Sequence, residues 1–125
     1  MMLSPNRIEI DLSALVHNLD QVKRLVGTST KIMGVVKSDA YGHGAVPVSR
    51  VLEAEGVHSL GVAHFHEALE LREQGIGCPI VVLCGINTSQ EAGAALEKDI
   101  IPVLFDKAQI PMPRAISRAF ENRSI

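Results

Sequence analysis

Short apolar segments alternate with amphipathic segments along most of this chain. The apolar segments are rich in valine, isoleucine and leucine and predict four buried strands, at 31–36, 59–63, 79–83 and 100–104. The segments between and before them carry apolar residues at helical spacing and predict helices, at 12–25, 46–55, 65–74 and 88–98. Near-continuous apolar strands joined by helices are typical of a parallel sheet with right-handed crossovers.

Residues that cap helices support these boundaries. Asp11 stands where the first helix needs an N-cap, and Gly27 follows its last turn. Thr88 and Glu91 have the spacing of a capping box at the start of the fourth helix. After the fourth strand the sequence is less regular, but proline is accepted in a first helical turn, so a further helix over 113–122 is expected.

Composition narrows the class of protein. Apolar residues make up 46% of the 125 residues, and the formal net charge is −2. No basic patch suited to nucleic acid is present, no apolar run approaches the roughly 20 residues of a membrane span, and the N-terminus lacks a secretory signal. Cys78 and Cys84 flank one predicted strand, too far apart for a disulfide. These features predict a cytoplasmic protein with reduced cysteines, and no nucleic-acid or membrane partner.

The candidate chemistry lies in the run Ile32 to Gly44, where the first strand ends on Lys37. The carboxyl end of a parallel strand opens into the part of an α/β fold that usually carries the active site. A lysine desolvated there loses its proton more easily and can attack a carbonyl to form a Schiff base. The alternative is a lysine that ends a strand and points into water, which is the commoner case for lysine in general.

Residues 34–44 read GVVKSDAYGHG, which closely resembles the pyridoxal-phosphate signature of alanine racemases. Gly34 and Ser38 each stand where that family commonly has alanine. The segments 7–19 and 67–72 also resemble the family's opening segment and its second barrel helix, so the similarity runs from about residue 7 to about residue 106.

The resemblance implies an α/β fold, a partial (β/α)8 (TIM) barrel of about four parallel β-α units. Such a barrel takes about 250 residues, so residues 1–125 are expected to be a truncated N-terminal, cofactor-binding barrel domain without the family's C-terminal β domain. A four-stranded part of a barrel has two open edges, each able to pair with another chain. We therefore expect a homo-oligomer.

The resemblance also implies the chemistry. Lys37 matches the family lysine that forms a Schiff base with pyridoxal 5'-phosphate and acts as one catalytic base. Tyr41 matches the tyrosine that binds the cofactor phosphate. The implied reaction is the interconversion of L-alanine and D-alanine, which supplies D-alanine for peptidoglycan. The family's second base and its other cofactor and substrate ligands match no residue of this chain, which is therefore expected to be weakly active or inactive alone.

Two other functions remain open at this point. The chain could be a non-catalytic module that binds or buffers pyridoxal phosphate, or an oligomerising remnant without activity. Cofactor binding separates the remnant from the other two, and racemisation of alanine separates the enzyme from the module.

Several further residues near the strand ends have structural interpretations. His43 is expected to fix the geometry of the loop, and Asp39 to stabilise a turn. His64 and His66 form a His-x-His pair, but two histidines without a third ligand are weak evidence for zinc, so no metal is expected.

The remaining candidate positions are interpreted as loop and helix-surface residues. Gly85 and Asn87 either shape a pocket or simply build the loop after the third strand. Glu67, Glu70 and Arg72 are interpreted as a solvated helix face.

Overall fold

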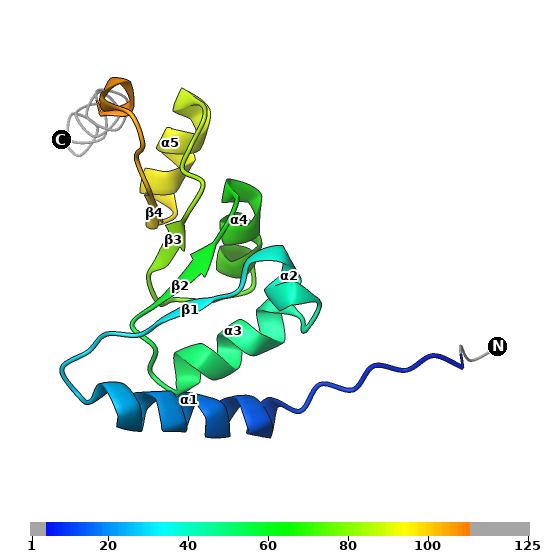
Figure 1. Cartoon of the computed structure of the whole chain (residues 1–125). Coiled ribbons are helices and arrows are strands. Elements are labelled where there is room, and N and C mark those ends of the chain that lie inside the picture. Colours follow the sequence, from blue (N-terminus) through cyan, green and yellow to red (C-terminus); the bar gives the residue numbers. More distant parts are fainter. Residues whose placement is uncertain (1–4, 111–125) are drawn as a thin grey trace.

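A parallel sheet of four strands forms the centre of the computed structural model, which describes residues 5–110 (Figure 1). The strands are β1 (Met33–Val35), β2 (Ser59–Val62), β3 (Ile80–Val82) and β4 (Ile100–Pro102), and they lie in the sheet in chain order. The register pairs Gly34 with Leu60, Leu60 with Ile80, and Ile80 with Ile100. Each strand lies within one of the four predicted apolar segments, so the predicted sheet is confirmed.

Four longer helices precede and connect the strands, with boundaries within about one residue of the prediction. They are α1 (Leu12–Val26), α3 (Ala45–Ala54), α4 (Phe65–Glu73) and α5 (Ser89–Glu97), and a single 3-10 turn, η1 (Lys107–Gln109), follows β4. A fifth short element, α2 (Lys37–Tyr41), directly follows β1 and was not predicted. The predicted helix at 113–122 lies outside the described residues.

The predicted N-caps are present, with one difference in detail. The Asp11 carboxylate accepts hydrogen bonds from the Ser13 and Ala14 N–H groups, at 2.9 and 3.2 Å. The Thr88 hydroxyl accepts from the Glu91 N–H at 3.1 Å. The Glu91 carboxylate returns to Asn87 at 2.7 Å, one residue before the cap, instead of to Thr88. Asn87 therefore takes part in capping α5, although it lies one residue before the N-cap.

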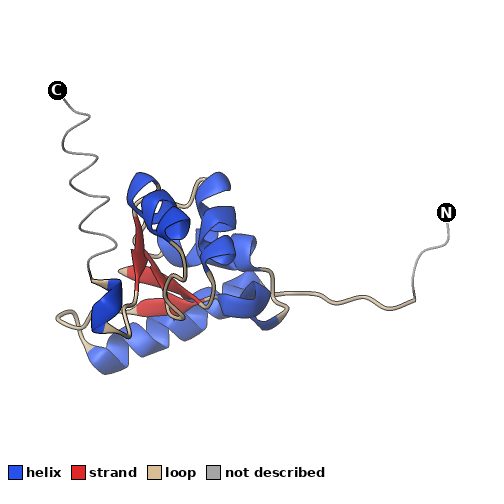
Figure 2. Ribbon diagram, turned by 90° about the horizontal axis from the view of Figure 1, so that it is seen from above, coloured by secondary structure: helices blue, strands red, loops and turns tan. Residues whose placement is uncertain are grey.

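Helices cover one face of the sheet, as Figures 1 and 2 show. The core on this side contains fully buried Leu60, Val62, Ile80 and Val82 from the strands and Leu71 from α4. On the opposite face, Met33, Val35 and Ile101 are 40%, 52% and 48% exposed. The described part of the chain thus buries the helix side of its sheet and leaves part of the other, apolar side open.

Arg72 joins loops at the amino ends of the strands, which contradicts its interpretation as part of a solvated helix face. Its guanidinium donates to the carbonyls of Ile76 and Cys78, at 2.7 and 2.8 Å, in the loop that leads into β3. It also donates to the carbonyls of Lys98 and Asp99, at 2.8 and 2.7 Å, just before β4. One side chain therefore satisfies four backbone acceptors in two loops.

Ser49 is a buried polar residue on the core side of α3. Its side chain is fully buried, and within residues 5–110 its hydroxyl has no hydrogen-bond partner. A buried hydroxyl without a partner costs desolvation energy, so Ser49→Ala is expected to stabilise the protein by about 1 kcal/mol. Urea unfolding would measure this. A loss of stability by a similar amount would show that the hydroxyl is satisfied in the protein.

Gly85 is required by the turn that follows β3, which supports its interpretation as a loop residue. Its φ is +73°, and an added Cβ would lie 2.6 Å from the carbonyl oxygen of Val103. Gly85→Ala is therefore expected to lower the free energy of unfolding by about 2 kcal/mol. The matched change is Gly93→Ala in α5, where an added Cβ meets nothing within 4 Å. Equal effects of the two changes in thermal unfolding would contradict the argument.

Candidate functional site

Lys37 lies at the carboxyl end of β1, as predicted. The preceding residue, Val36, is buried and donates its N–H to the Gly61 carbonyl at 2.8 Å, which anchors this end of the strand to β2. Lys37 itself is half-buried. The site is thus built on a fixed backbone, at the edge of the sheet where parallel strands place functional groups.

The backbone after Lys37 turns with the left-handed helical hand. Four successive residues, 38–41, have φ between 51° and 55°. Residues with a Cβ adopt this conformation at a cost of roughly 1 kcal/mol each, and usually singly. The glycine-spaced loop expected from the sequence is therefore a strained left-handed turn, which the surrounding contacts must hold in place.

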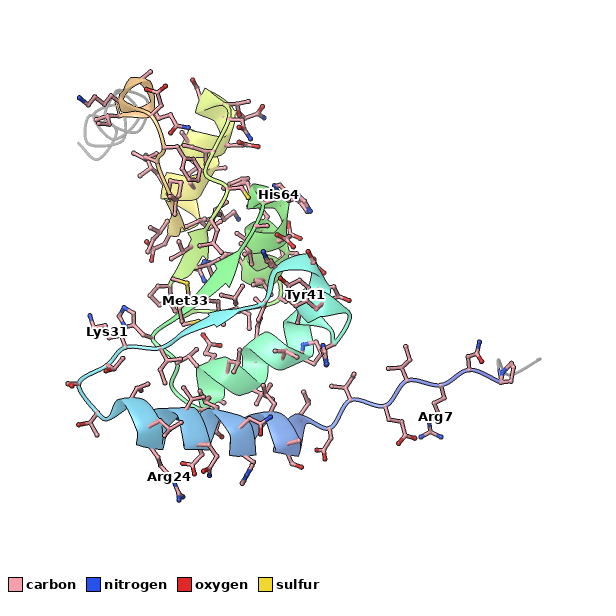
Figure 3. The ribbon with its side chains drawn as sticks, viewed as in Figure 1. Arg7, Arg24, Lys31, Met33, Tyr41 and His64 are labelled. Atoms are coloured by element: carbon pink, nitrogen blue, oxygen red, sulfur yellow. The ribbon has the colours of Figure 1, made fainter. Side chains whose placement is uncertain are left out.

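This turn brings the two predicted site residues together. The Lys37 Nζ lies 5.9 Å from the centroid of the Tyr41 ring. Tyr41 is 71% exposed, and in Figure 3 it lies beyond the carboxyl end of β1, whereas Lys31 lies before its amino end. Within residues 5–110 neither the lysine amine nor the tyrosine hydroxyl has a hydrogen bond or an ion pair, so both polar groups can take a ligand.

Asp39 and His43 stabilise the loop itself, in agreement with the interpretation from sequence. The Asp39 carboxylate accepts from the Ala45 N–H at 2.7 Å, at the start of α3. The His43 Nδ1 donates to the Ala40 carbonyl at 2.9 Å. Both side chains connect positions within one loop.

Glu67 has a role that the sequence interpretation missed. Its carboxylate accepts three backbone hydrogen bonds: from Ser38 at 2.6 Å, and from Ala63 and His64 at 2.8 Å each. Burial alone would raise the pKa of Glu67, but the hydrogen bonds from His64, Ser38 and Ala63, together with the nearby His66, outweigh it and lower the pKa below its usual value. Glu67 is therefore a charged group in the structure beside Lys37, and not part of a solvated surface.

The His-x-His pair lies at the start of α4. The rings of His64 and His66 stack, with centroids 5.8 Å apart and planes at 12° (His64 is labelled in Figure 3). Among residues 5–110, no group of three or more His, Cys, Asp or Glu residues is arranged to hold a metal ion. In the same range no helix is both long enough and apolar enough to cross a membrane.

Comparisons with known proteins give a consistent result. Residues 10–124 match the family model described as alanine racemase, N-terminal domain. Alanine racemase 2 of Caldanaerobacter subterraneus subsp. tengcongensis is 47% identical over 104 residues, which cover 83% of this chain and 26% of the relative. The alanine racemase of Sorangium cellulosum is 41% identical over 120 residues, which cover 93% of this chain and 32% of the relative.

Solved structures of alanine racemases are similar to this chain as well. An alanine racemase from Clostridium difficile 630 superposes with a TM-score of 0.83 at 35% identity, over 88% of this chain and 29% of that chain. One from Bacillus anthracis, with bound L-Ala-P, superposes with a TM-score of 0.77 at 34% identity, over 86% of this chain and 28% of that chain.

These matches extend over most of the chain and only a part of each relative. The chain spans about a quarter of the length of the first two curated relatives. Its four parallel β-α units correspond to the N-terminal part of the barrel in the solved alanine racemases, which confirms the predicted partial (β/α)8 barrel. On its sequence and its fold, the chain belongs to the alanine racemase N-terminal domain family.

Proposed function

We propose that this chain supplies the cofactor lysine of an alanine racemase, an isomerase that interconverts L-alanine and D-alanine with pyridoxal 5'-phosphate. The observation that carries the proposal is the placement of Lys37 at the carboxyl end of β1, with its amine 5.9 Å from the Tyr41 ring. The match of residues 10–124 to the racemase family supports it. As a racemase, the protein would supply D-alanine for peptidoglycan.

The residues present fit this cofactor. Lys37 offers a primary amine on a rigid strand end, which is the group that binds the cofactor aldehyde covalently. Tyr41 offers an exposed phenol hydroxyl on the same turn, which can donate to a phosphate oxygen. We assign Lys37 as the covalent attachment residue and Tyr41 as a phosphate ligand.

Lys37 would also act in the proton transfer. When bound, pyridoxal phosphate supplies an electron sink for negative charge at the Cα of an amino acid. The Lys37 amine then removes or returns the proton at Cα from one side. Racemisation also needs a proton donor on the opposite side, and we place that group outside this chain, as the family resemblance implies.

Alanine is the proposed substrate, because of the family. Among the related structures, the Clostridium difficile enzyme is in complex with cycloserine and the Bacillus anthracis enzyme has bound L-Ala-P. We further propose that the protein is cytoplasmic, in keeping with its free cysteines, Cys78 and Cys84, and that it is a homo-oligomer. Within residues 5–110 the outer sides of β1 and β4 pair with no strand, so an oligomer or further barrel strands can add there.

The experiment is to incubate the protein with pyridoxal phosphate, reduce it with borohydride, and map the labelled peptides by mass. A selective adduct on Lys37 is expected. Equal labelling of Lys23, Lys31, Lys98 and Lys107 would contradict the proposal. A racemisation assay on the same sample then separates an enzyme from a module that only binds the cofactor.

A further inference from the structure

We infer that Glu67 is a positioning residue for Lys37. Its carboxylate holds the strained turn after Lys37 against the carboxyl end of β2. This inference goes beyond the attachment of the cofactor and rests on the proposed role of Lys37.

The geometry joins two segments through one side chain. Ser38, the residue directly after Lys37, donates its N–H to one oxygen of Glu67 at 2.6 Å. Ala63 and His64, at the end of β2, donate to the other oxygen at 2.8 Å each. The carboxylate therefore bridges the carboxyl ends of two neighbouring strands, which is where the cofactor is proposed to bind.

The other hydrogen bonds of this turn are local. Ala40 donates to Val36, Gly42 and Gly44 donate to Asp39, and Asp39 accepts from Ala45, all within residues 36–45. Among the described residues, the Ser38 bond to Glu67 is the hydrogen bond that connects residues 38–44 to another β-α unit. The left-handed conformation at 38–41 is costly, so this external bond is well placed to hold it.

The bridge depends on a carboxylate at position 67, and a side chain of the same size without a second acceptor oxygen does not replace it. A carboxylate can accept from donors on both of its oxygens, whereas an amide has one oxygen and one NH2 group. In Glu67→Gln the one amide oxygen keeps two hydrogen bonds if it faces Ala63 and His64, and only one if it faces Ser38. The NH2 group is therefore expected to face the Ser38 N–H, donor against donor. The substitution keeps the size of the side chain and removes one side of the bridge.

Glu70 provides a matched control on the same helix. It is an exposed glutamate three residues further along α4, and within residues 5–110 its carboxylate accepts no hydrogen bond. Glu70→Gln makes the same change of charge and size without touching the turn.

The test measures two quantities in the unsubstituted protein, Glu67→Gln and Glu70→Gln. The first is amide hydrogen exchange at Ser38, with Leu60 in β2 as the reference for an intact sheet. The second is the rate of formation of the borohydride-trapped cofactor adduct on Lys37, relative to the exposed Lys31. A misplacement of about 1 Å can cost a reacting group two orders of magnitude in rate, so we expect Glu67→Gln to slow the Lys37 adduct roughly ten-fold or more.

We expect faster exchange at Ser38 and a slower Lys37 adduct in Glu67→Gln, with Leu60 protected as before and Glu70→Gln unchanged. Normal exchange at Ser38, or a normal adduct rate, in Glu67→Gln would overturn the inference about Glu67 alone. Absence of a Lys37 adduct from the unsubstituted protein would instead overturn the proposed function, and with it the cofactor role of Glu67. If Leu60 loses protection in Glu67→Gln, Glu67→Asp is measured in its place. The shorter side chain of Glu67→Asp keeps the charge but does not reach both Ser38 and the Ala63–His64 pair. A normal rate of Lys37 adduct formation in Glu67→Asp would likewise overturn the inference.

Discussion

Lys37→Ala is expected to eliminate the trapped cofactor adduct, and with it any racemisation that the protein shows. The methyl group of alanine has neither the amine that attaches the cofactor nor a base for the Cα proton, so two functions are lost together. The adduct is measured by peptide mapping after reduction, and racemisation by the appearance of D-alanine from L-alanine.

Lys31→Ala is the control for this change. Lys31 is an exposed lysine just before β1, at the opposite end of the strand from Tyr41 (Figure 3). Its removal is expected to leave both the adduct and the rate unchanged. An adduct that persists in Lys37→Ala would contradict the assignment of the lysine.

Arg72→Lys is expected to lower the free energy of unfolding by about 2–4 kcal/mol. The Arg72 guanidinium donates to four carbonyls in two loops, and a lysine ammonium has neither the reach nor the planar fork to satisfy all four. The Ile76 and Cys78 carbonyls are part-buried, and each costs desolvation energy if it is left without a donor. Chemical denaturation followed by circular dichroism measures the change.

Arg50→Lys on α3 is the matched control. Arg50 is exposed, and among residues 5–110 its guanidinium makes only long contacts, of 3.4 Å, to the carbonyl and the side chain of Gln74. A surface change of this kind is expected to alter stability by no more than about 0.5 kcal/mol. If the two substitutions have equal effects, the four carbonyl contacts do not contribute as argued.

The sequence predicted the sheet and its longer helices because their signals are local. A buried strand needs a run of β-branched residues, and a helix needs apolar spacing and a capping residue such as Asp11, all of which can be read without knowing the fold. Lys37 and Tyr41 were predicted as site residues for a different reason: they lie in a long motif that resembles one known family.

Glu67 and Arg72 were misinterpreted because their partners are backbone groups. Every residue has a backbone carbonyl and every residue except proline has an N–H. The sequence around Ser38 or Ile76 therefore does not reveal which hydrogen bond these groups make. A glutamate in the first turn of a helix, three residues after His64, was the available signal for Glu67, since such glutamates often reach back to backbone N–H groups. The left-handed turn at 38–41 had no signal, because Ser, Asp, Ala and Tyr all favour other conformations.

The strand order has a consequence for the synthesis of this protein. After β1, each strand pairs with the one that precedes it in the chain: β2 with β1, β3 with β2, and β4 with β3. When β2, β3 or β4 leaves the ribosome, the strand it pairs with has therefore already been synthesised, and no distant segment is needed. Folding can then keep pace with translation, one β-α unit at a time, and the Lys37 turn receives its Glu67 bond as soon as the second unit is complete.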